Sequence, residues 1–159
     1  MKEEFYANLP KKQMAAGAVF VDQQGRILIL KPSYRDLWTM PGGVIEQNES
    51  PRDACIREVR EEVGIACVPG QLLCVDYTAA SDSGVRHESI KFLFDGGILD
   101  ERAVAEIKAD GKEILRHEFV LPEVAYERLP HQLASRVRYA LDARQKGITA
   151  YLENGTLVR

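Results

Sequence analysis

Apolar residues along the chain fall into short, β-branched runs separated by polar turns. Residues 14–30 hold two such runs, with a polar stretch ending in Gly25 between them, which predicts a strand, a turn and a strand. Residues 71–79 and 87–99 predict two further strands joined by a polar connection. Residues 118–120 are strand-like and lead, at Leu121 and Pro122, into a short helix or turn.

Two segments show helical spacing instead. Residues 51–63 predict a short helix, and residues 131–146 predict an amphipathic helix with Leu133, Val137 and Leu141 on one side. Asn154 and Gly155 then separate two strand-like runs, which predicts a terminal hairpin. Because strands and helices do not alternate regularly, the order favours an α+β sandwich with helices on the faces of a mixed sheet.

Length and charge narrow the class of protein. A chain of 159 residues is the size of one domain, and we expect a single domain over 1–159. The net charge of −3 disfavours nonspecific nucleic-acid binding. No apolar run approaches the roughly 20 residues that cross a bilayer, and the first residues lack a signal-peptide pattern, so we expect a cytoplasmic protein without a membrane segment. Three cysteines without C-x-x-C spacing predict packed thiols.

The helix over 51–63 has clear ends and two different sides. Ser50 and Pro51 are typical of a helix start, and Gly64 is typical of a helix end. Helical spacing places an apolar packing stripe apart from a carboxylate cluster. The stripe consists of Cys55, Ile56, Val59 and Val63, and the cluster consists of Glu58, Glu61 and Glu62. Clustered like charges repel, whereas Mg²⁺ or Mn²⁺ would be attracted to these oxygens. A solvated acidic face is the alternative interpretation.

The surroundings of this helix resemble the Nudix hydrolase signature, G-x5-E-x7-R-E-U-x-E-E-x-G-U, where U is aliphatic. The chain supplies every fixed position: Gly43, Glu49, Arg57, Glu58, Val59, Glu61, Glu62, Gly64 and Ile65. So many residues at fixed offsets make the resemblance specific. It implies a Nudix-type α/β/α sandwich with a mixed central sheet.

The resemblance also implies roles for individual residues. Glu58, Glu61 and Glu62 match the metal-binding glutamates of the family, and the carbonyl of Gly42 commonly completes that site. Arg57 matches an arginine that orients a neighbouring glutamate.

Three glutamates outside the helix are further candidates. Glu49 matches a residue that supports the loop and helix and sometimes reaches the metal through water. Glu113 is the first candidate for a further metal ligand and Glu118 the second, with exposed surface charges as the alternative for both.

The implied reaction is metal-dependent hydrolysis of a diphosphate bond in a nucleoside diphosphate linked to another group. Mg²⁺, or alternatively Mn²⁺, would neutralise phosphate charge and activate the attacking water, and Glu58 or Glu61 would accept the proton. Lys31 and Arg35 are candidates for phosphate binding or are solvated charges. Trp38 is a candidate for stacking on a base or is a core residue.

Several alternatives stay open. The substrate, a small nucleotide, is compatible with a nucleoside triphosphate, a nucleotide sugar or a capped RNA end. A nucleotide sensor without turnover is the alternative function. A prenyl-diphosphate isomerase would need a cysteine facing the substrate, whereas Cys55 lies on the packing stripe. The helix and hairpin of 131–159 form an extension that would cap the sheet, cover the cleft or form a homodimer interface, and we favour capping.

Overall fold

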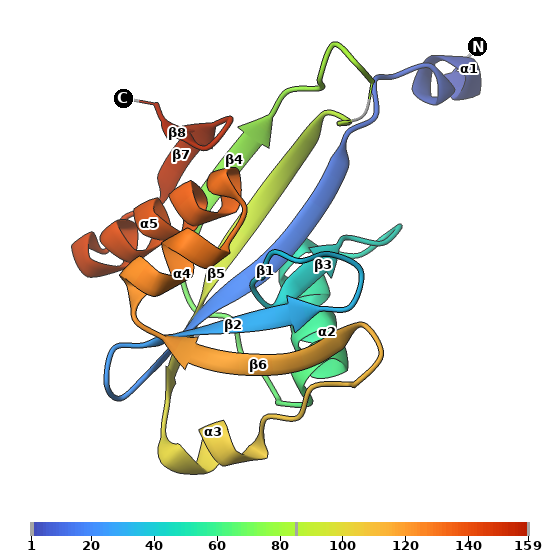
Figure 1. The fold of residues 1–159 in the computed structure, drawn as a ribbon. Helices are drawn as coiled ribbons and strands as arrows, with labels where there is room; N and C mark the ends of the chain where they lie inside the picture. The colour runs from blue at the N-terminus through green and yellow to red at the C-terminus, as the bar shows by residue number, and fades with distance from the viewer. Residues whose placement is uncertain (1, 85, 159) are drawn as a thin grey trace.

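The computed structural model describes residues 2–84 and 86–158, which form a mixed sheet covered by helices on both faces (Figure 1). The strands are β1 Gln13–Asp22, β2 Ile27–Pro32, β3 Gly42–Val44, β4 Leu72–Thr78, β5 Ser89–Leu99, β6 Ile114–Val120, β7 Ala150–Glu153 and β8 Thr156–Leu157. Their order in the sheet is β6-β2-β1-β5-β4-β7-β8, and β3 pairs with β1.

Strand β1 pairs with three other strands of this sheet. It runs parallel to β5, with Ala15 opposite Lys91 and Gly17 opposite Leu93. It runs antiparallel to β2 and to β3. Its residues from Ala16 to Asp22 are all buried, because helices cover both faces of the sheet at this point, and its apolar run is therefore continuous rather than alternating. The mixed sheet predicted from the sequence is confirmed.

The helices form the outer layers of the sandwich. They are α1 Lys2–Ala7, α2 Pro51–Val63, α3 Glu101–Glu106, α4 Pro122–Arg128 and α5 His131–Lys146. Helices α4 and α5 cover one face of the sheet and α2 covers the other, while α1 stands apart from the body near the N-terminus (Figure 1). The α/β/α sandwich implied by the signature is thus present.

Two apolar clusters join these layers. One lies between the sheet and the α4–α5 pair and includes Leu73 and Val137, both without solvent exposure. The other lies between the sheet and α2 and includes Leu30 and Val59, which are equally buried. Helix α2 is therefore anchored along its packing stripe, which fixes where its carboxylates point.

The bounds of α2 and α5 coincide with the two predicted helices, and the predicted hairpin forms with Asn154 and Gly155 at positive φ (52° and 77°). Elements α1, α3 and β3 are not predicted by the pattern. They contain six, six and three residues, too few to show a periodicity. None of the described helices is long and apolar enough to cross a membrane.

Candidate active site

The two ends of α2 are fixed by local hydrogen bonds. Ser50 has an extended backbone, and its hydroxyl accepts a bond of 3.1 Å from the N–H of Asp53. Gly64 adopts a left-handed conformation with φ 72°, and its N–H donates to the carbonyl of Arg60. Both predicted caps are confirmed, so α2 begins directly after the loop that follows β3 and ends at a defined residue.

The sides of α2 differ in exposure. Cys55, Val59 and Val63 are fully buried against the sheet, as predicted, and Ile56 is only partly buried. Glu61 is exposed on the opposite side, whereas Glu62 is only 5% exposed. The carboxylate cluster therefore extends from solvent into the interior.

Arg57 binds three carboxylates at once. Its Nε and Nη2 donate to the two oxygens of Glu49 at 2.8 and 2.9 Å, a bidentate pair. Its Nη1 donates to Glu58 Oε1 at 2.7 Å and to Glu61 Oε2 at 3.2 Å. Its Nη2 also donates to the carbonyl of Val44 at 3.0 Å, which ties the loop to the helix. The hydrogen bonds from Arg57 lower the pKa of Glu49 to about 2.

Glu62 is held by the backbone of β3. Its Oε2 accepts a hydrogen bond of 2.8 Å from the N–H of Gly42. Burial raises the pKa of Glu62 to about 8, and the nearby charges of Glu58, Glu113 and Asp110 act in the same direction. Burial likewise raises the pKa of Glu58 above its usual value, with the charges of Glu61 and Glu113 adding to the effect while Arg57 opposes it. The carboxylates at this site thus carry more negative charge than the guanidinium group of Arg57 can neutralise.

Close contacts require glycine at the first two positions of β3. Gly42 has φ 142°, and a Cβ there would overlap the backbone of Ala16 and Gly17. A Cβ on Gly43 would overlap the carboxylate of Glu58. The paired glycines therefore allow β3 to approach both β1 and the carboxylates of α2.

Asp110 connects the loop before β6 to α2, a role that the sequence analysis does not predict. Its carboxylate accepts hydrogen bonds from the N–H groups of Lys112, Glu113 and Ile114, and its own N–H donates to the carbonyl of Glu62 at 3.3 Å. The loop before β6 is therefore attached to the end of α2. An aspartate followed by Gly111 is a turn signal in the sequence that points to this role.

This attachment bears on the two candidate ligands outside the signature. The charge of Glu113 raises the pKa of both Glu58 and Glu62. Glu118 instead pairs with Arg128 at 2.6 Å. Of these two candidates, only Glu113 thus lies close enough to the carboxylates of α2 to affect their pKa values. Its metal-binding role stays a prediction.

The predicted metal ligands do not yet converge on one point. No group of three His, Cys, Asp or Glu side chains within 2–84 and 86–158 is arranged to hold a metal ion. Glu58 and Glu61 each direct an oxygen toward Arg57, and Glu62 directs one toward Gly42. The contact seen at Gly42 involves its N–H, so a role for its carbonyl also stays a prediction.

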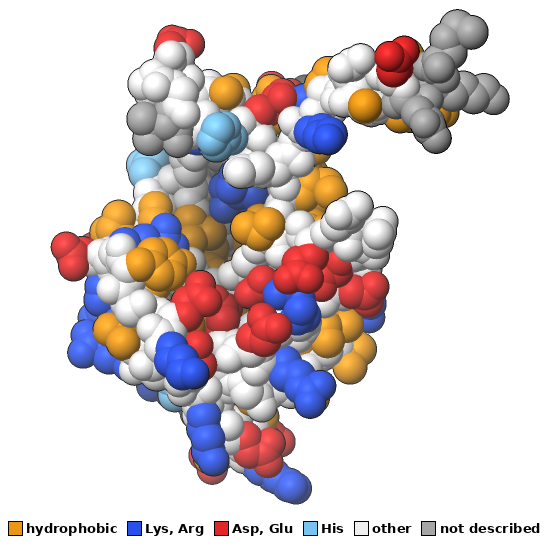
Figure 2. Space-filling view, turned by 90° about the vertical axis from the view of Figure 1, so that its right-hand side faces the viewer, with side chains coloured by type: hydrophobic (Ala, Val, Ile, Leu, Met, Phe, Trp, Pro, Cys, Tyr) orange, Lys and Arg blue, Asp and Glu red, His pale blue; other side chains and the backbone are white. Residues whose placement is uncertain are grey.

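A cleft of about 620 Å³ lies beside this cluster. In Figure 2 the acidic side chains gather next to a hollow whose walls carry hydrophobic, basic and histidine side chains. The walls come from β1, the loop 34–44, the start of β5 and the start of α5. Gly42 and Gly43 belong to the lining, so the cleft opens directly onto the backbone that contacts Glu58 and Glu62.

The three predicted substrate-binding residues have different surroundings. Arg35 is exposed, lines the cleft and lies over the ring of Tyr34. Lys31 donates to the carbonyls of Arg35 and Asp36 at 2.8 and 2.6 Å, and so holds the loop.

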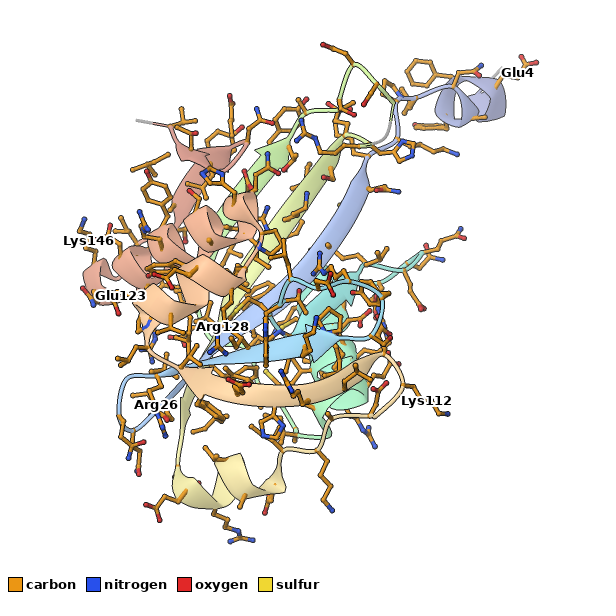
Figure 3. All side chains as sticks on the ribbon, viewed as in Figure 1. Glu4, Arg26, Lys112, Glu123, Arg128 and Lys146 are labelled. Atoms are coloured by element: carbon orange, nitrogen blue, oxygen red, sulfur yellow. The ribbon has the colours of Figure 1, made fainter. Side chains whose placement is uncertain are left out.

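Trp38 is buried and does not line the cleft. Its ring faces the guanidinium groups of Arg116 and Arg128 at 5.3 and 5.5 Å. Arg128 lies where α4 approaches β2 (Figure 3). Binding roles for Lys31, Arg35 and Trp38 stay predictions.

The profile of the NUDIX domain matches residues 11–143. The chain therefore belongs to the NUDIX family and is a Nudix hydrolase. The 8-oxo-dGTP diphosphatase of Proteus vulgaris is 36% identical over 86 residues, which cover 52% of this chain and 74% of that protein. The RNA pyrophosphohydrolase of Hydrogenovibrio crunogenus is 39% identical over 49 residues, 31% of this chain and only 30% of that protein.

Solved structures show the same fold. The MutT protein from Methanosarcina mazei Go1 matches with a TM-score of 0.68 and 24% identity, covering 88% of this chain and 99% of that one. The likeness thus extends through most of the chain and is not confined to the signature.

Proposed function

We propose that the protein hydrolyses a diphosphate bond in a nucleoside diphosphate linked to another group, in a reaction that depends on a divalent metal ion. The observation that carries this proposal is the arrangement of Glu58, Glu61 and Glu62 beside the cleft, with Glu62 buried against Gly42. The names of the relatives, a diphosphatase and a pyrophosphohydrolase, agree with this class of reaction.

The donor set fits Mg²⁺ or Mn²⁺. Carboxylate and carbonyl oxygens are the ligands that these hard cations prefer, and Glu58, Glu61, Glu62 and Glu113 supply them with the carbonyl of Gly42. The raised pKa values of Glu58 and Glu62 support this, because a nearby cation would stabilise their ionised forms. We expect Glu61 to turn away from Arg57 when it binds metal, and Glu58 to bind metal through Oε2 while its Oε1 stays on Arg57.

The residues of the chain divide the remaining tasks. A bound metal ion would neutralise phosphate charge and lower the pKa of the attacking water. Arg57 holds Glu49 and Glu58 in place, and Gly42 holds Glu62. Glu58 or Glu61 would accept the proton from water through a carboxylate oxygen. The cleft would hold the organic part of the substrate, with Arg35 at its wall.

A panel of nucleoside diphosphate and triphosphate derivatives, assayed with Mg²⁺ and with Mn²⁺, tests this proposal. Running the reaction in isotopically labelled water locates the bond that is cleaved. We expect turnover that needs metal and that Glu61→Gln and Glu62→Gln reduce by at least about 10²-fold, because each removes a charge from the metal site.

Glu123→Gln is the matched control, since Glu123 is an exposed glutamate on α4, away from α2 (Figure 3). Thermal unfolding of each variant shows whether the fold is retained. Unchanged turnover in both site variants would refute the proposal. Nucleotide binding without turnover across the whole panel would instead favour the sensor function.

A further inference from the structure

The cleft is positively charged although the chain as a whole is acidic. Its lining includes Arg35, Arg86, Lys91 and Arg136. No aspartate or glutamate lines it within the described part of the chain, whereas the full sequence carries a net charge of −3. The cleft is therefore suited to a ligand with negative charge.

Lys91 lacks a carboxylate of its own. It lies on β5, half-buried, and its Nζ donates to the hydroxyl oxygens of Ser89 at 2.5 Å and Thr78 at 3.3 Å. No carboxylate of residues 2–84 and 86–158 forms an ion pair with it. An ammonium group has three donors, so two neutral hydroxyls leave both its charge and part of its donor capacity available.

The nearest strand partner of Lys91 is already engaged. Asp76 lies opposite Lys91 on β4, but its Oδ2 accepts hydrogen bonds from Arg136 Nε and Nη2 at 2.9 and 2.8 Å. Its Oδ1 accepts a bond of 3.0 Å from the N–H of Gly155. The negative charge of Asp76 thus neutralises the positive charge of Arg136, and the charge of Lys91 has no carboxylate paired with it.

Burial, and next the charge of Arg136, lower the pKa of Lys91, while the charge of Asp76 acts in the opposite direction without cancelling them. Burial and Arg136 oppose the charged form of Lys91 in the free protein, and the charge of an anion bound beside it would stabilise that form. This perturbation is typical of a group placed for ligand binding.

The register of the sheet sets the distance between Lys91 and the candidate metal site. Lys91 pairs with Ala15 of β1, and Ala15 pairs with Val44 of β3. Two steps between neighbouring strands separate Lys91 from Val44 by about 10 Å. A ligand whose diphosphate lies near Gly42 and Glu62 would therefore place its more distant part beside Lys91.

We propose that Lys91, with Arg136 next to it, binds a negatively charged group on the part of the substrate that lies beyond the diphosphate. The group is a carboxylate or a phosphate ester. This proposal rests on the proposed function only in placing the diphosphate at the α2 end of the cleft. It makes Lys91 a residue that determines which nucleotide derivatives bind.

Two matched pairs of ligands test this proposal and distinguish the two anions. UDP-glucuronic acid differs from UDP-glucose by a carboxylate, and NADP⁺ differs from NAD⁺ by a phosphate ester. Kd is measured with Mg²⁺ in a Glu61→Gln background, which leaves the cleft lining intact. We expect the member with the additional carboxylate or phosphate ester, in at least one pair, to bind about tenfold more tightly than its partner, as one charge-assisted hydrogen bond provides.

Lys91→Met should remove this preference and leave the Kd of the partner without the additional anionic group unchanged, because methionine keeps the aliphatic stem and loses the charge. Lys91→Arg should restore the preference. Lys146→Met is the matched control, because Lys146 lies at the far end of α5 and pairs with Asp142 (Figure 3). It should retain the full preference.

Equal affinity within both pairs, or no binding of any of the four ligands, overturns the proposal. An equal loss of affinity for both members of a pair in Lys91→Met also overturns it, because that result indicates a structural role. The proposed function fails separately, through absence of turnover on the wider panel. Hydrolysis of other nucleotides together with equal affinities in both pairs would leave that function standing and refute the role of Lys91.

Discussion

Replacing Gly43 with alanine should impair catalysis while leaving the fold almost as stable as before. The added Cβ would overlap the carboxylate of Glu58, which is the far end of a flexible side chain and can move aside. The movement breaks the bond of 2.7 Å from Arg57 Nη1 to Glu58 Oε1, between side chains that are 25% and 16% exposed. Such a partly exposed bond contributes about 1 kcal/mol.

Part of that loss is offset in the unfolded state. Replacing glycine with alanine restricts the unfolded chain and stabilises a protein by roughly 0.4–1 kcal/mol where the native backbone allows alanine. Gly43 has no positive φ, so this gain applies. The free energy of unfolding should therefore change by less than about 1 kcal/mol. Turnover should fall by about 10²-fold, because displacement of a catalytic carboxylate by an ångström has an effect of that size.

The adjacent glycine provides the contrast. Alanine at Gly42 would keep φ near 142° at a strain of roughly 1–3 kcal/mol, and its Cβ would overlap the backbone of Ala16 and Gly17 in β1. Backbone at the centre of the sheet cannot move aside, so we expect a loss of more than about 3 kcal/mol in the free energy of unfolding.

Urea unfolding and initial rates of hydrolysis measure the two effects. Gly70→Ala is the control, since its added Cβ would meet only ordinary contacts with Asp95. Nearly normal turnover in Gly43→Ala, or a loss of stability there as large as in Gly42→Ala, would refute the reasoning.

Three further changes test the fold. Ser50→Ala removes the acceptor of the Asp53 N–H and should lower the free energy of unfolding by about 1 kcal/mol; an unchanged melting temperature would contradict this. Arg136→Met leaves the fully buried carboxylate of Asp76 without its cation and should lower stability by about 3–5 kcal/mol, with partial recovery when Asp76→Asn is added. Urea unfolding of the double-mutant cycle checks the pair, and simple additivity would argue against it. Burial alone would raise the pKa of Asp22, but hydrogen bonds from Arg26 and Gln24 lower it overall. Because the folded-state pKa lies below the unfolded value of about 4, Asp22 stabilises the fold above that pH and loses its contribution as the pH falls through the folded-state pKa. Unfolding measured between pH 7 and pH 3 should therefore show a smaller decline in Asp22→Asn than in the wild type, and parallel curves would refute it.

The helix α2 was predictable because its information is local. Ser50 and Gly64 each form a hydrogen bond with a backbone group within four residues of themselves. Both ends of the helix can therefore be predicted from the local sequence, without knowledge of the rest of the fold. The apolar spacing of Cys55, Val59 and Val63 likewise follows from helical geometry alone. Helical spacing also separates Glu58, Glu61 and Glu62 from this packing stripe. The resemblance to the Nudix signature then predicts that these three carboxylates bind metal.

The cleft was not predictable because its residues come from separate elements. Lys91 appears in the sequence as one charge within an apolar strand, and Arg136 as one charge within an amphipathic helix. Only the pairing of β5 with β4, and the packing of α5 over β4, bring them together. Tertiary pairing of this kind leaves no periodic signal in a single sequence.

The C-terminal segment was expected to cap the sheet, and the structure gives it a second connection. Helix α5 covers one face and β7 extends the sheet beside β4, so the segment does complete the sandwich. Its hairpin turn is also connected to the cleft by hydrogen bonds, because the N–H of Gly155 donates to Asp76 and Asp76 accepts from Arg136, which lines the cleft. The carbonyl of Gly155 accepts a further bond from Ser135, one residue before Arg136. The position of a cleft cation therefore depends on a turn almost at the end of the chain, and changes in that turn should alter ligand binding without touching the carboxylates of α2.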